Sequence, residues 1–453
     1  MQIRKDVLKL AGPVLTEQLF ITTIGVLNTI IASGIGKEAI SAIGTVDSFN
    51  NIIIFFFNSL AVGGTVVVAQ YMGQGNAGEA KEAAKQAIFS SMVISTFLTL
   101  AAWLLRDVII FSFMGKAEKT VMDYAVVYFG ITLLNYPLTA FSFVASGILR
   151  SSGHQGETMK INIIINGTNI VLSYLLIYGI SLKNMHLNFS IQGLGVKGAA
   201  IAITLARLTG VILFFIALVK NSQILSRKAV KSFRINFPMQ KTILNIGLPA
   251  GIESFVFNIG KFVQQIFIIS LGTASIAANT ISWSVLGLLI IPGNAFSIVA
   301  MTMVGYFMGM EDSEEARKIN FYLVKLAMSC KLIISLIVFP FATVIASVYS
   351  RDAEVIRMTS EIIRMNAVAI PILWPASFLV PSGLRGAGDS KFTMVVSISS
   401  LWIFRVLVGY IFSITLHFGV VGLWAAMYFD WIARGIIYYL RLQRGKWIRK
   451  MVP

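Results

Sequence analysis

Long apolar runs separated by short polar segments dominate the pattern of this chain. A helix needs about 20 mostly apolar residues to cross the hydrocarbon core of a bilayer. By that measure the pattern predicts twelve transmembrane helices, at residues 10–33, 50–71, 86–105, 124–148, 161–180, 193–219, 243–270, 282–307, 319–347, 362–382, 392–414 and 418–440. We therefore expect an all-α polytopic membrane protein.

The second half of the chain repeats the first. Setting Pro13 on Pro249 gives an offset of 249 − 13 = 236 residues, and the same offset places Glu17 on Glu253. Three further pairs share this offset: Asn28 with Gln264, Gly36 with Gly272, and Asn58 with Asn294. A register held over that length indicates a duplication.

Each half holds six predicted spans, an even number, so both halves enter the membrane from the same side. This arrangement is a parallel repeat with a pseudo-two-fold axis along the membrane normal. We expect an N-lobe at 1–219 with spans one to six and a basic cytoplasmic linker at 220–242. A C-lobe at 243–453 then holds spans seven to twelve and a basic cytoplasmic tail.

Composition and charge support a membrane location and orient the chain. Hydrophobic residues make up 56% of it, charged residues 13%, and the mean hydropathy is +0.79, so there are too few charges to solvate a globular surface. Of the Lys and Arg residues in short loops and at span ends, 22 fall on the side that holds both termini and 8 on the other. Positive side chains stay on the cytoplasmic side, which predicts cytoplasmic termini and a multi-pass protein of the cell (inner or plasma) membrane. The net charge of +17 reflects this topology and contact with anionic lipids, so no nucleic-acid partner is expected.

Four short motifs recur in order along the chain. They are Gly12-Pro13 with Glu17-Gln18, the run from Ala69 to Asn76, the run from Leu384 to Asp389, and Trp402 to Arg405. In this order and spacing, and duplicated, they make the chain resemble the multidrug and toxic compound extrusion (MATE) transporters over essentially its whole length. The resemblance implies two lobes around a central cavity and export of organic, often cationic, compounds driven by inward movement of H⁺ or Na⁺.

Each lobe carries one polar stripe on an otherwise apolar first helix. Glu17 and Asn28 are eleven residues apart, which places them only about 20° apart around a helix, and Glu253 and Gln264 stand in the same relation. Intramembrane carboxylates are costly and are functional candidates by default. The functional interpretation is that each buried glutamate takes up a proton or a cation in competition with substrate. The structural alternative is that each fills a backbone gap left by the proline or pairs with a lysine near the interface.

The sequence departs from the family at the N-lobe cation site. MATE members that resemble this chain carry an aspartate where Asn28 stands, and another in the fifth span after an Asn-Ile pair. Here Asn169 matches, but Ser173 replaces the acid. Neutral Asn and Ser side chains coordinate Na⁺ weakly through oxygen and cannot titrate, so Glu17 and Glu253 are the carboxylates left to couple an ion to transport.

Two further sets of polar groups lie within the spans. Lys261 lies two turns deeper than Glu253, where its charge either holds Glu253 ionised or discourages a cationic substrate. Asn58 and Asn294 either line the cavity or bond neighbouring helices.

Three other charged residues lie in the last two spans. Arg405 is in the eleventh, and Asp430 forms an i, i+4 pair with Arg434 in the twelfth. Paired intramembrane charges face the protein interior, so we expect this group to join helices.

The sequence carries no enzyme constellation. Its three histidines fall in loops or at span ends, no His/Cys cluster has metal-ligand spacing, and no Gly-rich phosphate loop with its Lys is present. We therefore expect a monomeric secondary antiporter without cofactor or metal, exchanging cationic or amphipathic organic compounds for H⁺ or Na⁺ by alternating access. The alternatives are a lipid-linked oligosaccharide flippase of the same wider superfamily and a membrane scaffold that transports nothing.

Overall fold

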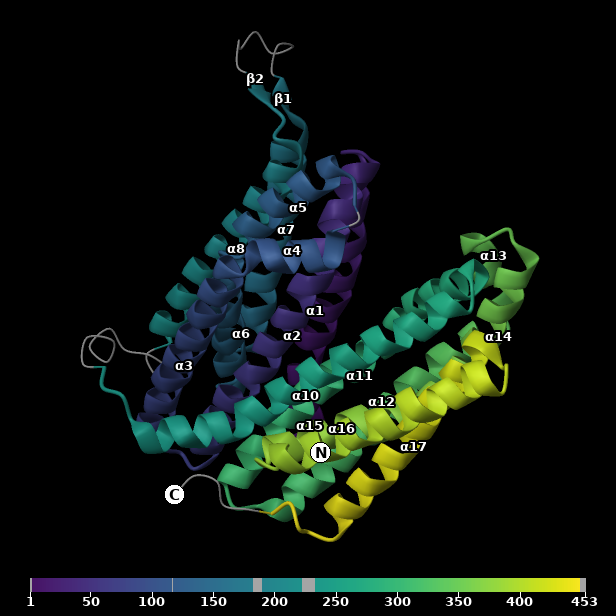
Figure 1. The fold of residues 1–453 in the computed structure, drawn as a ribbon. Helices are drawn as coiled ribbons and strands as arrows, with labels where there is room; N and C mark the ends of the chain where they lie inside the picture. The colour runs from purple at the N-terminus through teal and green to yellow at the C-terminus, as the bar shows by residue number, and fades with distance from the viewer. Residues whose placement is uncertain (1, 116, 182–189, 222–232, 449–453) are drawn as a thin grey trace. The chain divides into compact units, whose positions relative to one another are not determined.

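The computed structural model describes residues 2–115, 117–181, 190–221 and 233–448, which are almost wholly helical (Figure 1). The first half contains α1 (Gln2–Ser33), α2 (Lys37–Gly73), α3 (Ala77–Leu104), α4 (Arg106–Met114), α5 (Lys119–Thr132), α6 (Asn135–Ser151), α7 (Gln155–Tyr178), β1 (Gly179–Ser181), β2 (Ser190–Gln192) and α8 (Gly195–Lys220). The second half contains α10 (Phe237–Ser270), α11 (Thr273–Gly309), α12 (Ser313–Val338), α13 (Ala342–Tyr349), α14 (Ala353–Trp374), η2 (Pro375–Leu379), α15 (Val380–Gly386), α16 (Ser390–Ser400), η3 (Leu401–Val408), η4 (Ile411–Thr415) and α17 (Gly419–Gln443). The expected all-α polytopic fold is confirmed.

Most residues of each of the twelve expected spans are helical in the described chain, but the ninth span is broken at residues 339–341 between α12 and α13. Ten helical segments are long and apolar enough to cross a membrane, and α5 with α6, bent by 45° at the break between them, form an eleventh. The helix α1, 32 residues long, covers the first expected span. The central parts of the expected linker and the end of the basic tail lie outside the described residues.

The structure differs from the hydropathy pattern in two further respects. The short strands β1 and β2 pair antiparallel, with Gly179 opposite Gln192, between the fifth and sixth spans, where only a loop was expected. The tenth and eleventh spans are not regular α-helices but contain the wider π-helical segments η2, η3 and η4. In η2 the segment begins at Pro375, whose ring removes a backbone donor and disturbs regular α-helical bonding.

Repeat-equivalent glycines shape the turns that precede α2 and α11. Gly36 has a φ of +128° and Gly272 a φ of +94°, values that residues with a Cβ rarely adopt. The duplication seen in the sequence therefore extends to the backbone conformation of these turns.

The helices form two compact units, and each unit has its own apolar core. Unit 1 comprises Met1–Leu15, Ala69–Asn76 and Asn245–Pro453, and unit 2 comprises Thr16–Val68 and Ala77–Leu244. The core of unit 1 includes Phe296, Leu323 and Ile363, all buried. In unit 2 the buried rings of Phe57 and Phe129 lie in the corresponding core.

Within unit 1, the end of α2 crosses the end of α11 at repeat-equivalent glycines. A Cβ on Gly73 would collide with the carbonyl oxygen of Tyr306, and a Cβ on Gly309 would collide with that of Gln70 and lie 2.7 Å from its carbonyl carbon. Small residues let membrane helices approach closely, and the obstacle here is backbone, which cannot rotate away.

We expect Gly309→Ala to destabilise unit 1 by about 1–3 kcal/mol, the usual cost of overpacking a close contact. Gly287→Ala, in the same helix, is the matched control, because a Cβ at Gly287 meets no atom within 4 Å. Thermal unfolding of the purified variants in detergent measures the difference. Equal unfolding temperatures for the two variants would contradict the close approach.

Candidate functional site

Glu17 forms a buried ion pair within unit 2. It lies on α1 four residues after Pro13, and its side chain is almost fully buried, with a relative exposure of 2%. Its Oε1 accepts hydrogen bonds from Arg150 Nη2 of α6 at 2.5 Å and from Asn162 Nδ2 of α7 at 2.8 Å. Its Oε2 is buried and has no hydrogen-bond partner among the described residues. One oxygen is thus held by a cation, and the other has no partner in the part of the chain that the structure describes.

Glu253 repeats this arrangement within unit 1. It lies on α10 four residues after Pro249, with a relative exposure of 8%. Arg385 Nη2 of α15 donates to its Oε1 at 2.6 Å, and Arg385 Nε donates to Thr393 Oγ1 of α16 at 3.4 Å. In the described part of unit 1, nothing bonds to the buried Oε2 of Glu253.

The two arginines belong to the same repeated motif. Each follows a Ser-Gly pair, four residues after Ser146 in the case of Arg150 and three after Ser382 in the case of Arg385. The duplication therefore preserves a carboxylate on one helix and its guanidinium partner on another. The sequence shows both motifs, but neither alternative drawn from it named the arginine as the partner.

Arg405, Asp430 and Arg434 form one fully buried cluster in unit 1. Asp430 Oδ2 accepts from Arg405 Nε and from Arg434 Nη2, each at 2.6 Å. Asp430 Oδ1 accepts from Ser400 Oγ at 2.6 Å. The cluster joins η3 to α17 with two cations around one carboxylate, so it carries a net positive charge.

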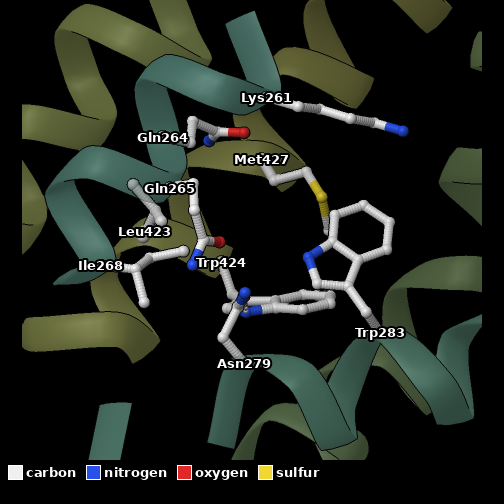
Figure 2. A pocket seen from close by; sticks show the side chains of 9 residues that line it. All are labelled: Lys261, Gln264, Gln265, Ile268, Asn279, Trp283, Leu423, Trp424 and Met427. Carbon is white, nitrogen blue, oxygen red and sulfur yellow. Dashed lines mark hydrogen bonds between the residues drawn. The ribbon is translucent and has the colours of Figure 1, made fainter. Parts of the chain in front are cut away.

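Unit 1 also contains a pocket of about 270 Å³ (Figure 2). It brings together two predicted residues, Lys261 and Gln264 of α10, with Trp283 of α11 and Trp424 of α17. Gln264 Nε2 donates to the backbone oxygen of Arg405 at 3.3 Å, which links the pocket wall to the cluster. Figure 2 shows Lys261 extending past Met427, on the side of the pocket where the Trp283 indole lies.

A second pocket, of about 150 Å³ in unit 2, contains a carboxylate that the sequence analysis missed. Asp47 of α2 lines it and accepts hydrogen bonds from Tyr128 Oη at 3.1 and 3.3 Å. Asn135 and Arg207 also line it, and Arg207 makes no ion pair with Asp47 within 4.0 Å. Asp47 was overlooked because the apolar run begins at residue 50, whereas α2 begins at Lys37. The polar residues at 47, 50 and 51, spaced for one helix face, were the available signal.

The other predicted residues lie apart from these pockets. Ser173 Oγ donates to Asn169 Oδ1, one turn away on α7, at 3.4 Å, and both are buried. Asn294 is half-buried and Asn58 exposed. The side chain of Asn28 lies outside the described residues, so its predicted role stays a prediction.

The fold and these buried charges define a class: a membrane transporter built from two repeated six-span segments. The chain belongs to the MatE family, the MATE transporters, which it matches over residues 13–175 and 249–411, one match in each repeat. It is 26% identical to the uncharacterized transporter YisQ of Bacillus subtilis, over 97% of this chain and 94% of that protein. It is 25% identical to the probable multidrug resistance protein NorM of Thermotoga maritima, over 100% and 94% of the two chains. The resemblance drawn from the motifs is thereby confirmed.

Solved structures of similar proteins share the fold. A MOP superfamily transporter from Pyrococcus furiosus, whose binding pocket has reverse polarity, superposes with a TM-score of 0.87 at 23% identity, over 98% of this chain and 96% of that one. An outward-facing MATE family multidrug resistance transporter superposes with a TM-score of 0.87 at 22% identity, over 98% and 96%. At this identity the likeness concerns the fold alone.

Proposed function

We propose that this protein exports organic compounds, cationic or amphipathic, in exchange for H⁺ or Na⁺ by alternating access of an N-lobe and a C-lobe. The observation that carries the proposal is the pair of buried glutamates, one in each repeat; in each, one oxygen is bonded to an arginine and the other has no partner among the described residues. The names of the curated relatives support the class of substrate, since several are multidrug resistance proteins.

The chemistry of a Glu–Arg pair couples ion uptake to rearrangement. A proton or Na⁺ arriving at the unpartnered Oε2 neutralises the carboxylate and weakens its bond to Arg150 or Arg385. A buried guanidinium that loses its counter-ion costs several kcal/mol. Ion uptake therefore favours a conformation in which that arginine reaches water or another anion, and release of the ion favours return.

For topology and assembly we propose what the sequence predicts. We place the lobes at 1–219 and 243–453, joined by the basic linker 220–242, with both termini in the cytoplasm of a cell that carries the protein in its plasma membrane. The protein works as a monomer and uses no cofactor or metal beyond the coupling ion.

Ethidium efflux from proteoliposomes under separately imposed pH and Na⁺ gradients tests the proposal. Efflux accelerated by one of the two gradients, and absent from protein-free liposomes, is the expected result. If neither gradient alters the movement of ethidium, norfloxacin or other cationic dyes, the antiport proposal is wrong. Movement of a fluorescent lipid-linked oligosaccharide across the same bilayers would then favour the flippase.

The unit 2 pocket supplies the acid for a cationic substrate, and Asp47→Asn tests this role. The change removes the only carboxylate among the described residues that line the pocket, whereas the cation of Arg207 stays. We expect the affinity for ethidium to fall about tenfold, the scale of one partly screened charge contact. Fluorescence titration of purified protein measures it, with Asp123→Asn, an exposed acid of the same unit, as control. An unchanged affinity in Asp47→Asn would place the cationic group elsewhere.

A further inference from the structure

We propose that the unit 1 pocket beside Lys261 is a binding site for an aromatic carboxylate, with the carboxylate on Lys261 and the ring against the two indoles. This assignment deepens the proposed function, on which its role in transport rests. The site is defined by charge, by free hydrogen-bond donors and by apolar lining, all within one unit.

The charge around the pocket is positive. The ring of Phe257 is flanked by Lys261 Nζ at 5.1 Å, by the guanidinium of Arg405 at 5.0 Å and by that of Arg434 at 5.9 Å. Among the described residues, the one carboxylate paired with any of these three cations is that of Asp430. Three cations and one carboxylate leave an excess of positive charge. A cationic ligand would increase this excess, and an anionic ligand would offset it.

Lys261 itself lacks an anion. In the described part of the chain no carboxylate oxygen lies within 4.0 Å of its ammonium and no hydrogen-bond acceptor is bonded to it; its contacts are the rings of Phe257 and, at 5.3 Å, of Trp283. Cation–π contacts of this length leave the three ammonium hydrogens available to a ligand.

Amide groups add further donors to the same pocket. Asn279 uses its Oδ1 to accept from Trp424 Nε1 at 3.1 Å, which orients its NH₂ group as a donor. Gln265 lines the pocket and makes no hydrogen bond to another described side chain or backbone group. The NH₂ group of Asn279 can donate to a carboxylate but not to an ammonium, whereas the amide of Gln265 can serve either ligand, so among the two amides Asn279 is the one that favours a carboxylate.

The rest of the lining suits a flat ring. The indoles of Trp283 and Trp424 lie 5.2 Å apart between centroids with their planes tilted by 47°, and Ile268, Leu423 and Met427 complete the apolar surface (Figure 2). The volume of about 270 Å³ is near the lower end of small-molecule pockets. It suits one ring or two fused rings bearing the carboxylate.

Isothermal titration calorimetry of the full-length purified protein tests the site with three ligands of one shape: 1-naphthoate, 1-naphthamide and 1-naphthylmethylammonium. We expect 1-naphthoate to bind at least about tenfold more tightly than either of the others, the scale of one charged contact. The Lys261→Gln variant loses this preference, whereas Lys261→Arg retains it, and Lys325→Gln, an exposed lysine of the same unit, binds like the wild type.

Equal affinities of the wild type for 1-naphthoate and 1-naphthamide would overturn the proposal. This comparison needs no variant, so the proposal stays testable even if Lys261→Gln fails to fold. A carboxylate preference that persists in folded Lys261→Gln would overturn it as well. Ethidium efflux by the wild type separates this test from the proposed function. If the wild type shows gradient-driven efflux but no preference for the carboxylate, only the proposed site is wrong. If it prefers the carboxylate but shows no gradient-driven efflux, only the proposed antiport is wrong.

Discussion

Asp430→Asn is expected to destabilise the protein by about 3–5 kcal/mol, the cost of removing one partner of a buried ion pair. Asp430 is fully buried and is the shared partner of Arg405 and Arg434. Asparagine keeps the shape and one acceptor oxygen but leaves two buried guanidinium groups without a counter-ion. Thermal unfolding in detergent measures the loss, with Glu361→Gln, an exposed acid of the same unit, as the control.

A triple variant separates the cost of unpaired charge from the value of the cluster. Replacing Arg405 by Met, Asp430 by Leu and Arg434 by Met removes every charge at once, and apolar replacements of a buried ionic group are often tolerated. We expect this variant to unfold at a higher temperature than Asp430→Asn alone. If Asp430→Asn unfolds at the same temperature as the wild type, the cluster does not stabilise the junction of η3 and α17 as its geometry indicates.

Glu17→Gln combined with Glu253→Gln is expected to abolish gradient-driven efflux. Glutamine occupies the same space and still accepts a hydrogen bond from Arg150 or Arg385, but it cannot take up a proton or balance a cation. Substrate still moves down its own concentration gradient in this variant, because the pathway remains. What is lost is the response to the ion gradient.

Each single glutamine variant keeps one coupled repeat, so we expect a partial loss in each. The matched control is Glu118→Gln with Glu361→Gln, which changes one exposed glutamate in each unit. Size-exclusion chromatography and downhill ethidium movement establish that a variant is folded and open to substrate. Full coupling in both single variants and in the double variant would remove the glutamates from the mechanism.

The sequence predicts more of the architecture than of the candidate site. Apolar runs long enough to span a bilayer coincide with the long apolar helices of the described residues, and the shared offset of Pro13 and Pro249 indicates the duplication. The sequence did not indicate Asp47 as a site residue because the apolar run marks only residues 50–71 of this helix. The helix α2 begins earlier, at Lys37, so its polar first part lies outside that run. The hairpin of β1 and β2 is held by backbone hydrogen bonds, which leave no hydropathy signal.

The partners within the site depend on tertiary contacts that one sequence does not reveal. The motif holding Arg150 was visible, but its bond to Glu17 joins residues 133 positions apart. The pocket beside Lys261 draws its walls from α10, α11 and α17, and Trp424 enters it from near the far end of the chain. The local sequence indicates such residues individually, but their contacts with one another depend on the tertiary fold.

The most direct test of the central claim compares ethidium efflux from proteoliposomes that contain the wild type, the Glu17→Gln/Glu253→Gln variant and the exposed-glutamate control. Each sample is measured with and without the ion gradient that accelerates the wild type. We expect the gradient to accelerate efflux in the wild type and the control, and we expect equal rates with and without the gradient in the double variant. Undiminished acceleration in the folded double variant would show that Glu17 and Glu253 do not couple the ion gradient to efflux.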